Sequence, residues 1–322
     1  MFKKAPACAP GLFDAENQTR KQDMSSLDRR DTLLALAVIL IWGAHFAVIK
    51  AGVTQLGPFV SLTLRFGLTA LAFAPFARWP GWPVFRRMAI VGVLMGVIHQ
   101  GLLFAALGRL DSASVAVLMQ SQTIFAVLMG WMILRERFGW RTALGLGVGA
   151  LGLVVMLGVP DVAASLGGFA LAMASSLVLS YAYIRMRQLS HVHGPTLIAV
   201  LNGVSFPFAL LASFTLAAGD RGWAHAPAAD WRIVGFVLAY QVGLVSFSHS
   251  LWQKLLARNE VARVTCYTLL MPPIAIAVGV IFMGTPLTRQ LFEGAGLILA
   301  GLGIVVLRRV QKHRNAPLAA VE

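Results

Sequence analysis

The chain has 322 residues, of which 58% are hydrophobic and only 12% are charged, against about 25% charged residues in an ordinary soluble protein. This composition excludes a typical soluble enzyme. The 27 Lys and Arg residues outnumber the 13 Asp and Glu residues and give a net charge of +14, which suits either nucleic-acid binding or a membrane protein with basic loops.

In chain order, the apolar segments predict an all-α polytopic membrane protein with ten transmembrane helices. Residues 1–31 form a polar tail of mixed charge, which we expect to be disordered, and residues 308–322 form a second tail. Most of the expected helices are long enough to cross a bilayer core about 30 Å thick. They cover 32–51, 58–77, 88–108, 113–134, 140–159, 166–186, 195–217, 232–256, 262–284 and 290–307. Every connection is short, so no soluble domain is expected between them.

The positions of the basic residues predict the orientation, because cytoplasmic loops retain Lys and Arg. With the N-terminus inside, 21 basic residues fall on the cytoplasmic side and 5 on the opposite side, and Arg65 is left within a helix. We therefore expect a multi-pass protein of the bacterial inner membrane with both termini in the cytoplasm. The bases are spread over many loops and tails, so nucleic acid is not an expected partner.

The two halves of the chain resemble each other at offsets of 137 to 149 residues. The superposed pairs include Gly145 with Gly294, Gly152 with Gly301, Trp42 with Tyr181, and Arg65 with Asn202. We expect two five-helix repeats, at 32–159 and 166–307. Because five is odd, the second repeat must enter the membrane in the opposite orientation, which is a common design of transporters that work by alternating access.

Arg65 is the sharpest candidate for substrate contact, because an ionisable group inside a bilayer is costly and is a functional hypothesis by default. It lies about seven residues into the second helix, roughly 10 Å deep at 1.5 Å per residue. Its guanidinium could grip a substrate carboxylate. A structural clamp on nearby carbonyl groups is an equally weighted alternative, as is a side chain that extends to the outer headgroups.

Other candidates are polar and aromatic residues of the expected helices. Histidine titrates near neutrality and could carry a coupling proton, although a buried histidine is more often simply hydrogen-bonded. For each aromatic residue, core packing is the simpler alternative. Asn202 mirrors Arg65 in the second repeat, and Lys50 is expected to extend to the outer interface. The candidates besides Arg65 are His45, His99, His249, Asn202, Trp42, Tyr181, Trp252 and Tyr267.

Several motifs carry a family resemblance over about residues 32–308. The run that begins Trp42-Gly43-Ala44 and the triplet Leu64-Arg65-Phe66 resemble motifs of the drug/metabolite transporter superfamily, in particular its EamA-type ten-helix exporters. Leu118-Met119-Gln120-Ser121-Gln122 is similar to a motif of the bacterial O-acetylserine/cysteine exporters, and it adds Gln120 to the candidate substrate contacts. Thr285, Tyr181 and Arg135 depart from the family pattern, which usually has Glu, Trp and Gly there.

The resemblance implies an exporter of small metabolites, amino acids or their derivatives above all, that uses alternating access and the proton gradient. A multidrug or nucleotide-sugar carrier of the same superfamily is the alternative. A membrane-embedded transferase would need an acid/base motif of His, Asp or Glu at a membrane interface. No such pair stands out except His191 and His193, which we interpret as solvated residues of an expected cytoplasmic loop. We expect no catalytic residue, cofactor or metal. The expected partners are a small-molecule substrate, the lipid bilayer and protons as the candidate coupling ion; the oligomeric state stays open.

Overall fold

The computed structural model describes residues 28–134, 139–189, 192–216, 222–259, 264 and 267–314, and every regular element in these ranges is helical. Almost all of the N-terminal tail, which we expect to be disordered, lies outside the described residues. Most of the C-terminal tail and the loop residue Arg135 lie outside them as well.

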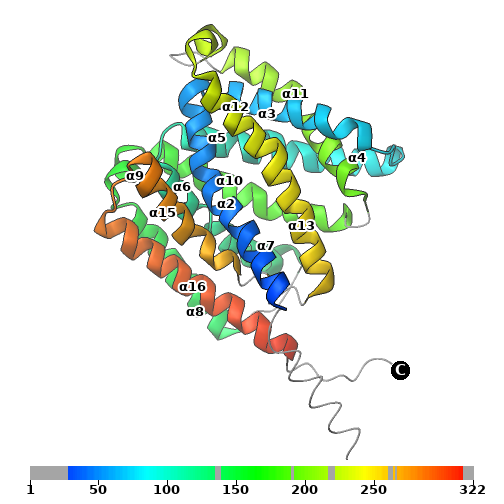
Figure 1. Cartoon of the computed structure of the whole chain (residues 1–322). Helices are drawn as coiled ribbons and strands as arrows, with labels where there is room; N and C mark the ends of the chain where they lie inside the picture. Colours follow the sequence, from blue (N-terminus) through cyan, green and yellow to red (C-terminus); the bar gives the residue numbers. More distant parts are fainter. Residues whose placement is uncertain are drawn as a thin grey trace, which may run out of the picture.

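The first half of the chain folds into long apolar helices joined by short turns (Figure 1). Gly57, at a φ of 74°, and Pro58 make the sharp turn between the first two, because glycine tolerates positive φ and proline suits the first helical turn. The elements are α2 (Arg29–Leu56), α3 (Pro58–Phe73), η1 (Ala74–Phe76), α4 (Trp82–Gly92), η2 (Val93–Gln100), α5 (Gly101–Leu107), α6 (Ser112–Leu118), α7 (Ser121–Leu134) and α8 (Trp140–Met156).

The second half repeats this plan after the short helix α9 (Pro160–Ala164). Its elements are α10 (Leu166–Met186), η3 (Arg187–Leu189), α11 (Gly194–Thr215), η4 (Trp223–Ala228), α12 (Trp231–Ala239), η5 (Tyr240–Val245), α13 (Ser246–Arg258), η6 (Tyr267–Leu270), α15 (Met271–Met283) and α16 (Arg289–Arg314). Gly284 ends α15 in the left-handed conformation, at a φ of 67°, as a typical C-terminal cap.

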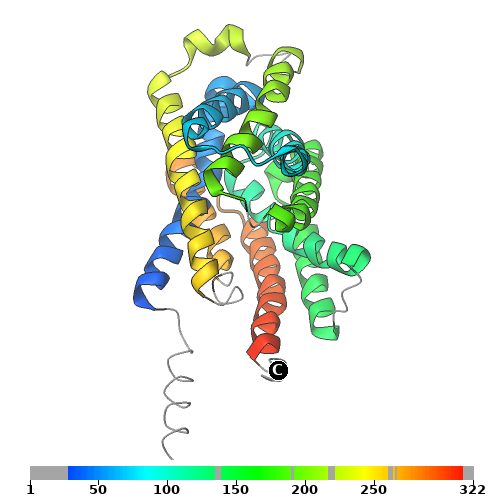
Figure 2. The same ribbon diagram turned by 90° about the vertical axis from the view of Figure 1, so that its right-hand side faces the viewer.

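The all-helical fold class is confirmed. Two expected bounds are wrong, because α2 continues to Leu56 instead of ending at 51, and the third long helix begins at Trp82 instead of 88. Within the described residues, seven helices are long and apolar enough to cross a membrane, and Trp140–Met156 and Tyr267–Met283 are shorter apolar helices. The count of ten stays a prediction. The start of α2 and the end of α16 lie at the same end of the bundle, as an even number of crossings requires (Figures 1 and 2).

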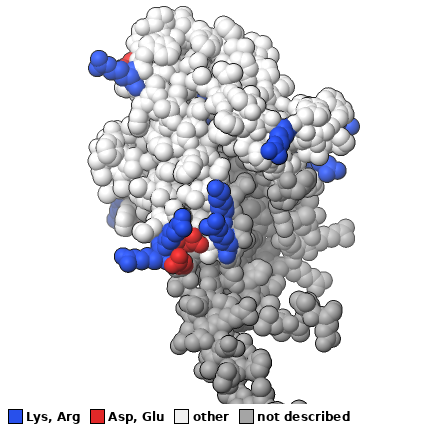
Figure 3. All heavy atoms as spheres, turned by 45° about the vertical axis from the view of Figure 1, so that its right-hand side comes forward, with Lys and Arg blue, Asp and Glu red and all other residues white. Residues whose placement is uncertain are grey.

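Contacts between the halves follow a two-fold pattern. Helix α8 packs along α16, and α3 packs along α11, so each pair joins equivalent helices of the two halves. The contact of α2 with α15 is matched by that of α10 with α7. On the face shown in Figure 3, charged side chains gather towards the ends of the molecule and the surface between them is almost uncharged. This arrangement is what a bilayer-spanning bundle of paired repeats requires.

Glycines allow α8 and α16 to approach backbone to backbone. A Cβ atom on Gly152 would lie 2.8 Å from the backbone nitrogen of Ile298 and 2.9 Å from the carbonyl oxygen of Gly294. A Cβ atom on Gly301 would overlap the carbonyl oxygen of Gly145. We call this contact the glycine seam; it comprises Gly145, Gly149, Gly152, Gly294 and Gly301, and small residues at such seams are typical of close helix packing in membranes.

Candidate functional site

Arg65 lies about midway along α3, where its charge is held by an amide and by aromatic rings. Its Nη1 donates a hydrogen bond of 2.9 Å to Oε1 of Gln100. Its Cζ atom lies 5.9 Å from the ring centroid of Phe66 and 5.8 Å from that of Phe104. Among the described residues no carboxylate forms an ion pair with it. The side chain therefore presents an un-neutralised positive charge, which suits an anionic ligand group.

Three predicted histidines surround this charge from different helices. His45 on α2, His99 on η2 and His249 on α13 are all close enough for Arg65 to act on them electrostatically. The His249 side chain is nevertheless exposed, and those of His45 and Arg65 are half-buried. The three histidines thus differ in exposure, although all of them stand within the electrostatic reach of Arg65.

Trp42 connects α2 to α13 next to His249. Its Nε1 donates a hydrogen bond of 2.8 Å to Oγ of Ser248. Its ring meets that of His249 edge to face at 5.0 Å between centroids, and that of Trp252 at 5.1 Å. We call Trp42, Ser248, His249 and Trp252 the Trp42 cluster. It forms a rigid aromatic wall, because each large side chain is fixed by its neighbours.

A second group of polar atoms lies where η5 faces α2. The ring of Tyr240 stacks on that of His45 at 6.2 Å, and its hydroxyl donates a hydrogen bond of 2.6 Å to the carbonyl oxygen of Ile41. The side chain of Gln241 lies beside that of His45, without a hydrogen bond between them. Nε2 of His45 and Oε1 of Gln241 are both buried without a hydrogen-bond partner in the described part of the chain. Buried polar groups are normally satisfied, so these two atoms have capacity for a ligand.

Both glutamines of the site belong to π-helical segments. Gln100 is the last residue of η2 and Gln241 is the second residue of η5. Such segments widen a helix by one residue per turn and are frequent at functional sites. Gln100, Gln241 and Ser248 were not among the site residues predicted from the sequence. A usable signal was present, because His99-Gln100 and Tyr240-Gln241 recur at an offset of 141 residues.

Other predicted site residues lie in contacts of their own. Nδ1 of His99 lies 2.8 Å from Oγ of Ser175 on α10, within a buried helix contact. Gln120 lies between α6 and α7 and lines a small, mostly apolar hollow together with α8 and α16. Asn202 does not reach across the repeat interface, since its Nδ2 donates a hydrogen bond of 2.8 Å to the carbonyl oxygen of Ile198 on its own helix.

Tyr181 and Tyr267 are half-buried. The hydroxyl of Tyr267 donates a long hydrogen bond of 3.5 Å to Oγ1 of Thr32 near the start of α2. Tyr267 also packs against the apolar cluster that contains Trp252. The structure thus brings Arg65, His45, His249, Trp42 and Trp252 together and leaves Gln120, Asn202 and Tyr181 without a visible link to that group.

The expectation for Lys50 is wrong. Its Nζ does not extend to the headgroups but donates hydrogen bonds of 2.6 Å and 2.7 Å to the carbonyl oxygens of Leu107 and Leu110. The lysine therefore caps the end of α5, where carbonyl groups lack helical partners and attract a cation.

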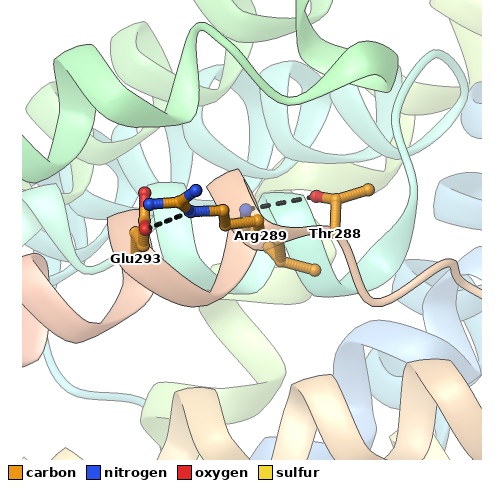
Figure 4. A network of polar contacts seen from close by, with 4 residues as sticks. Thr288, Arg289 and Glu293 are labelled. Carbon is orange, nitrogen blue, oxygen red and sulfur yellow. Dashed lines mark hydrogen bonds and ion pairs between the residues drawn. The ribbon is translucent and has the colours of Figure 1, made fainter.

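Polar contacts at the same end tie the turns together. The backbone N–H of Asp111 donates to Oδ2 of Asp161 at 2.8 Å. Burial and the neighbouring Asp111 carboxyl raise the pKa of Asp161 above its ordinary value. At the start of α16, Oγ1 of Thr288 accepts from the N–H of Leu291, and Arg289 pairs with Glu293 at 2.7 Å on the surface (Figure 4).

Comparison with known proteins identifies the family. The sequence pattern of the EamA-like transporter family matches residues 31–158 and again residues 166–307. A "Probable amino-acid metabolite efflux pump" of Salmonella typhimurium is 27% identical over 87% of this chain and 96% of its own length. The protein of that name from Escherichia coli is 26% identical over 87% and 96%. A "Probable terminal-alkyne amino-acid exporter" of Streptantibioticus cattleyicolor is 25% identical over 86% and 94%.

A solved crystal structure shares the fold. It superposes with a TM-score of 0.57 at 19% sequence identity and covers 87% of this chain and 98% of its own. With two family matches over most of the chain and an all-helical apolar bundle, the chain belongs to the EamA-like transporter family and is a multi-pass membrane transporter.

Proposed function

We propose that this protein exports amino acids or closely related zwitterionic metabolites across a bacterial inner membrane. One observation carries the proposal: the positive charge of Arg65 is held by a glutamine oxygen, and no carboxylate of the described residues forms an ion pair with it. A substrate carboxylate can replace the amide of Gln100, because an Arg–carboxylate pair is stronger than a hydrogen bond to a neutral oxygen. The names of the relatives from Salmonella typhimurium, Escherichia coli and Streptantibioticus cattleyicolor agree with this substrate class.

The Trp42 cluster supplies the wall against which the rest of the substrate packs. Trp42 and Trp252 are fixed by each other and by Ser248, so their rings lose little conformational freedom when a substrate binds. An aromatic face also attracts an ammonium group. We therefore expect the substrate to be a small molecule with a carboxylate for Arg65, an amino group and a short side chain that packs on Trp42.

We infer that transport follows alternating access between the two repeats, with both termini in the cytoplasm. The equivalent helices α3 and α11 pack against each other next to Arg65, so rocking of one half against the other changes access to the site. His249 is exposed and can titrate near neutral pH, so it is our candidate carrier of a coupling proton.

Flux in oriented vesicles tests the proposal. Labelled cysteine, O-acetylserine and leucine are followed with wild-type protein, with Arg65→Ala and with Arg65→Lys. We expect amino-acid flux in the wild type, loss of about 100-fold in Arg65→Ala and partial retention in Arg65→Lys, since lysine keeps the charge without the planar fork. Arg232→Ala, at an exposed arginine on α12, is the matched control and should transport normally.

Two outcomes would contradict the proposal. Amino-acid flux that persists in Arg65→Ala removes Arg65 from the site. Lack of any amino-acid flux, with flux of lipophilic drugs or nucleotide sugars instead, assigns the protein to the other carriers of this fold. An imposed pH gradient should accelerate export in the wild type and not in His249→Ala, which tests the coupling separately.

A further inference from the structure

The two π-helical segments occupy equivalent places in the two halves. Segment η2 interrupts the third long helix between α4 and α5, and η5 interrupts the corresponding helix between α12 and α13. Each contains an aromatic residue followed directly by a glutamine, His99-Gln100 in one and Tyr240-Gln241 in the other. Each aromatic residue contacts the first helix of the opposite half: His99 contacts Ser175 on α10, and Tyr240 contacts Ile41 on α2. Gln100 and Gln241 are therefore counterparts.

The glutamine of the first half has a cationic partner. Oε1 of Gln100 accepts a hydrogen bond of 2.9 Å from Arg65, which stands on the neighbouring helix α3. The oxygen of this amide therefore already has a donor from the protein. In the first half, the protein itself supplies the positive charge of the site.

The glutamine of the second half lacks such a partner. The position equivalent to Arg65 is Asn202, and its Nδ2 is turned back to the carbonyl oxygen of Ile198. Gln241 is only 2% exposed, and its Oε1 has no hydrogen-bond partner among the described residues. Within the same described ranges, the buried Nε2 of the adjacent His45 also has no hydrogen-bond partner. An orphaned buried oxygen carries a desolvation penalty that a bound donor would remove.

We propose that Gln241 and His45 form a subsite for the amino group of the substrate, so that the substrate supplies on this side the cation that Arg65 supplies on the other. This subsite deepens the proposed function and rests on it: the carboxylate binds Arg65, and the ammonium donates to Oε1 of Gln241. The ring of His45, in the tautomer with Nε2 unprotonated, accepts a second hydrogen bond.

The charge of Arg65 makes the subsite selective. Arg65 acts electrostatically on His45, so a simple amine that reaches the subsite is repelled by the guanidinium. A zwitterion brings a carboxylate that neutralises Arg65 at the same time. Both charges of an amino acid are then required together, and a molecule that lacks either one binds weakly.

Matched ligands separate the two contacts. Purified wild-type protein is titrated with L-cysteine and L-leucine, with their counterparts that lack the amino group (3-mercaptopropionate and 4-methylpentanoate), and with those that lack the carboxylate (cysteamine and isoamylamine). Apparent dissociation constants follow from the rise of the unfolding temperature with ligand concentration. This readout does not depend on transport.

In the wild type, removal of the amino group should weaken binding about 10- to 100-fold, the range for a hydrogen bond to a charged group. Gln241→Leu should bind the amino acid no more tightly than the counterpart without the amino group. It should still bind the amino acid more tightly than the counterpart without the carboxylate. Gln241→Met has an unbranched side chain of similar length and should behave alike, which guards against failure of the leucine variant to fold. Gln100→Leu is the matched control at the counterpart glutamine and should retain the preference for the amino group.

The inference is overturned if either apolar variant of Gln241 folds and still prefers the amino acid over its amine-lacking counterpart as strongly as the wild type. It is also overturned if the wild type binds both ligands equally. If no amino acid raises the unfolding temperature of the wild type, the proposed function fails and the subsite fails with it. The first two outcomes leave the proposed function standing, so the two failures can be told apart.

Discussion

The glycine seam and the surroundings of Arg65 differ in how completely their groups are packed and hydrogen-bonded. At the seam, α8 and α16 meet backbone to backbone, and an added Cβ atom on Gly152 would come within 3 Å of backbone atoms of α16. Around Arg65, the residues are aromatic or polar, two buried polar atoms have no hydrogen-bond partner in the described part of the chain, and His249 is exposed. The seam is complete without a ligand, whereas the Arg65 region is not.

This difference separates stability from transport. Close packing maximises contact between two helices and leaves little freedom for change in volume. An incompletely satisfied polar group is unfavourable in the free protein and becomes favourable when a ligand supplies the missing partner. We therefore expect substitutions in the seam to affect folding, and substitutions near Arg65 to affect transport.

The largest effect is expected for Gly301→Ala. Its Cβ atom would overlap the carbonyl oxygen of Gly145 and lie 2.5 Å from the backbone nitrogen of Gly149, and backbone atoms cannot move aside easily. We expect destabilisation of about 3 kcal/mol, at the upper end for overpacking. The unfolding temperature in detergent measures it. Gly296→Ala on the same helix has open space around its Cβ atom and is the control; equal unfolding temperatures for the two variants would contradict the close packing of the seam.

Arg65→Met should have the opposite effect: transport should be lost while stability is kept. Flux should fall about 100-fold as in Arg65→Ala, because the contact to the substrate carboxylate is lost. The unfolding temperature should stay the same or rise, since replacement of a buried charge by an apolar side chain of similar length is often neutral or stabilising. A marked drop in unfolding temperature would instead make Arg65 a structural clamp.

A smaller effect is expected for Ser175→Ala. The Ser175 hydroxyl lies 2.8 Å from Nδ1 of His99 and 2.9 Å from its carbonyl oxygen, and all these groups are buried. Loss of this contact should destabilise the protein by about 1 kcal/mol. Transport should change little if the role of His99 is to hold η2 against α10. A loss of flux without a loss of stability would place His99 with the substrate residues; Thr215→Ala, at an exposed hydroxyl, is the control.

The smallest effect concerns pH and Asp161→Asn. Because the pKa of Asp161 is raised in the folded protein, its ionised form is unfavourable there. Stability from this group is therefore present below the ordinary pKa of about 3.8 and is lost as the pH rises through the raised value. The asparagine keeps an oxygen for the N–H of Asp111. We expect the variant to unfold at the wild-type temperature at pH 3.5 and slightly higher at pH 7. A variant that is less stable than wild type at pH 7 would show that attraction to Lys50 outweighs burial.

Much of the fold was predictable because hydropathy and basic residues are strong local signals. The expected helix at 166–186 coincides with α10, and those at 58–77 and 195–217 are close to the observed bounds. The break between α6 and α7 and the two π segments were missed, since neither interrupts the run of apolar residues. The site was predicted in part. Arg65 stood out by its charge inside a helix, whereas Gln100 and Gln241 are neutral and carry no such signal.

The sequence by itself determined the class of protein, the positions of its helices and the recurrence of its two halves, because these depend on composition and spacing along the chain. Only the tertiary structure decided which polar residues share a site. It placed Lys50 at the end of α5 and Asn202 against its own helix, and it left Oε1 of Gln241 without a hydrogen-bond partner in the ranges that the structure describes. Contacts between helices distant in sequence depend on the direction of each side chain and on the packing of neighbours, and a local pattern specifies neither.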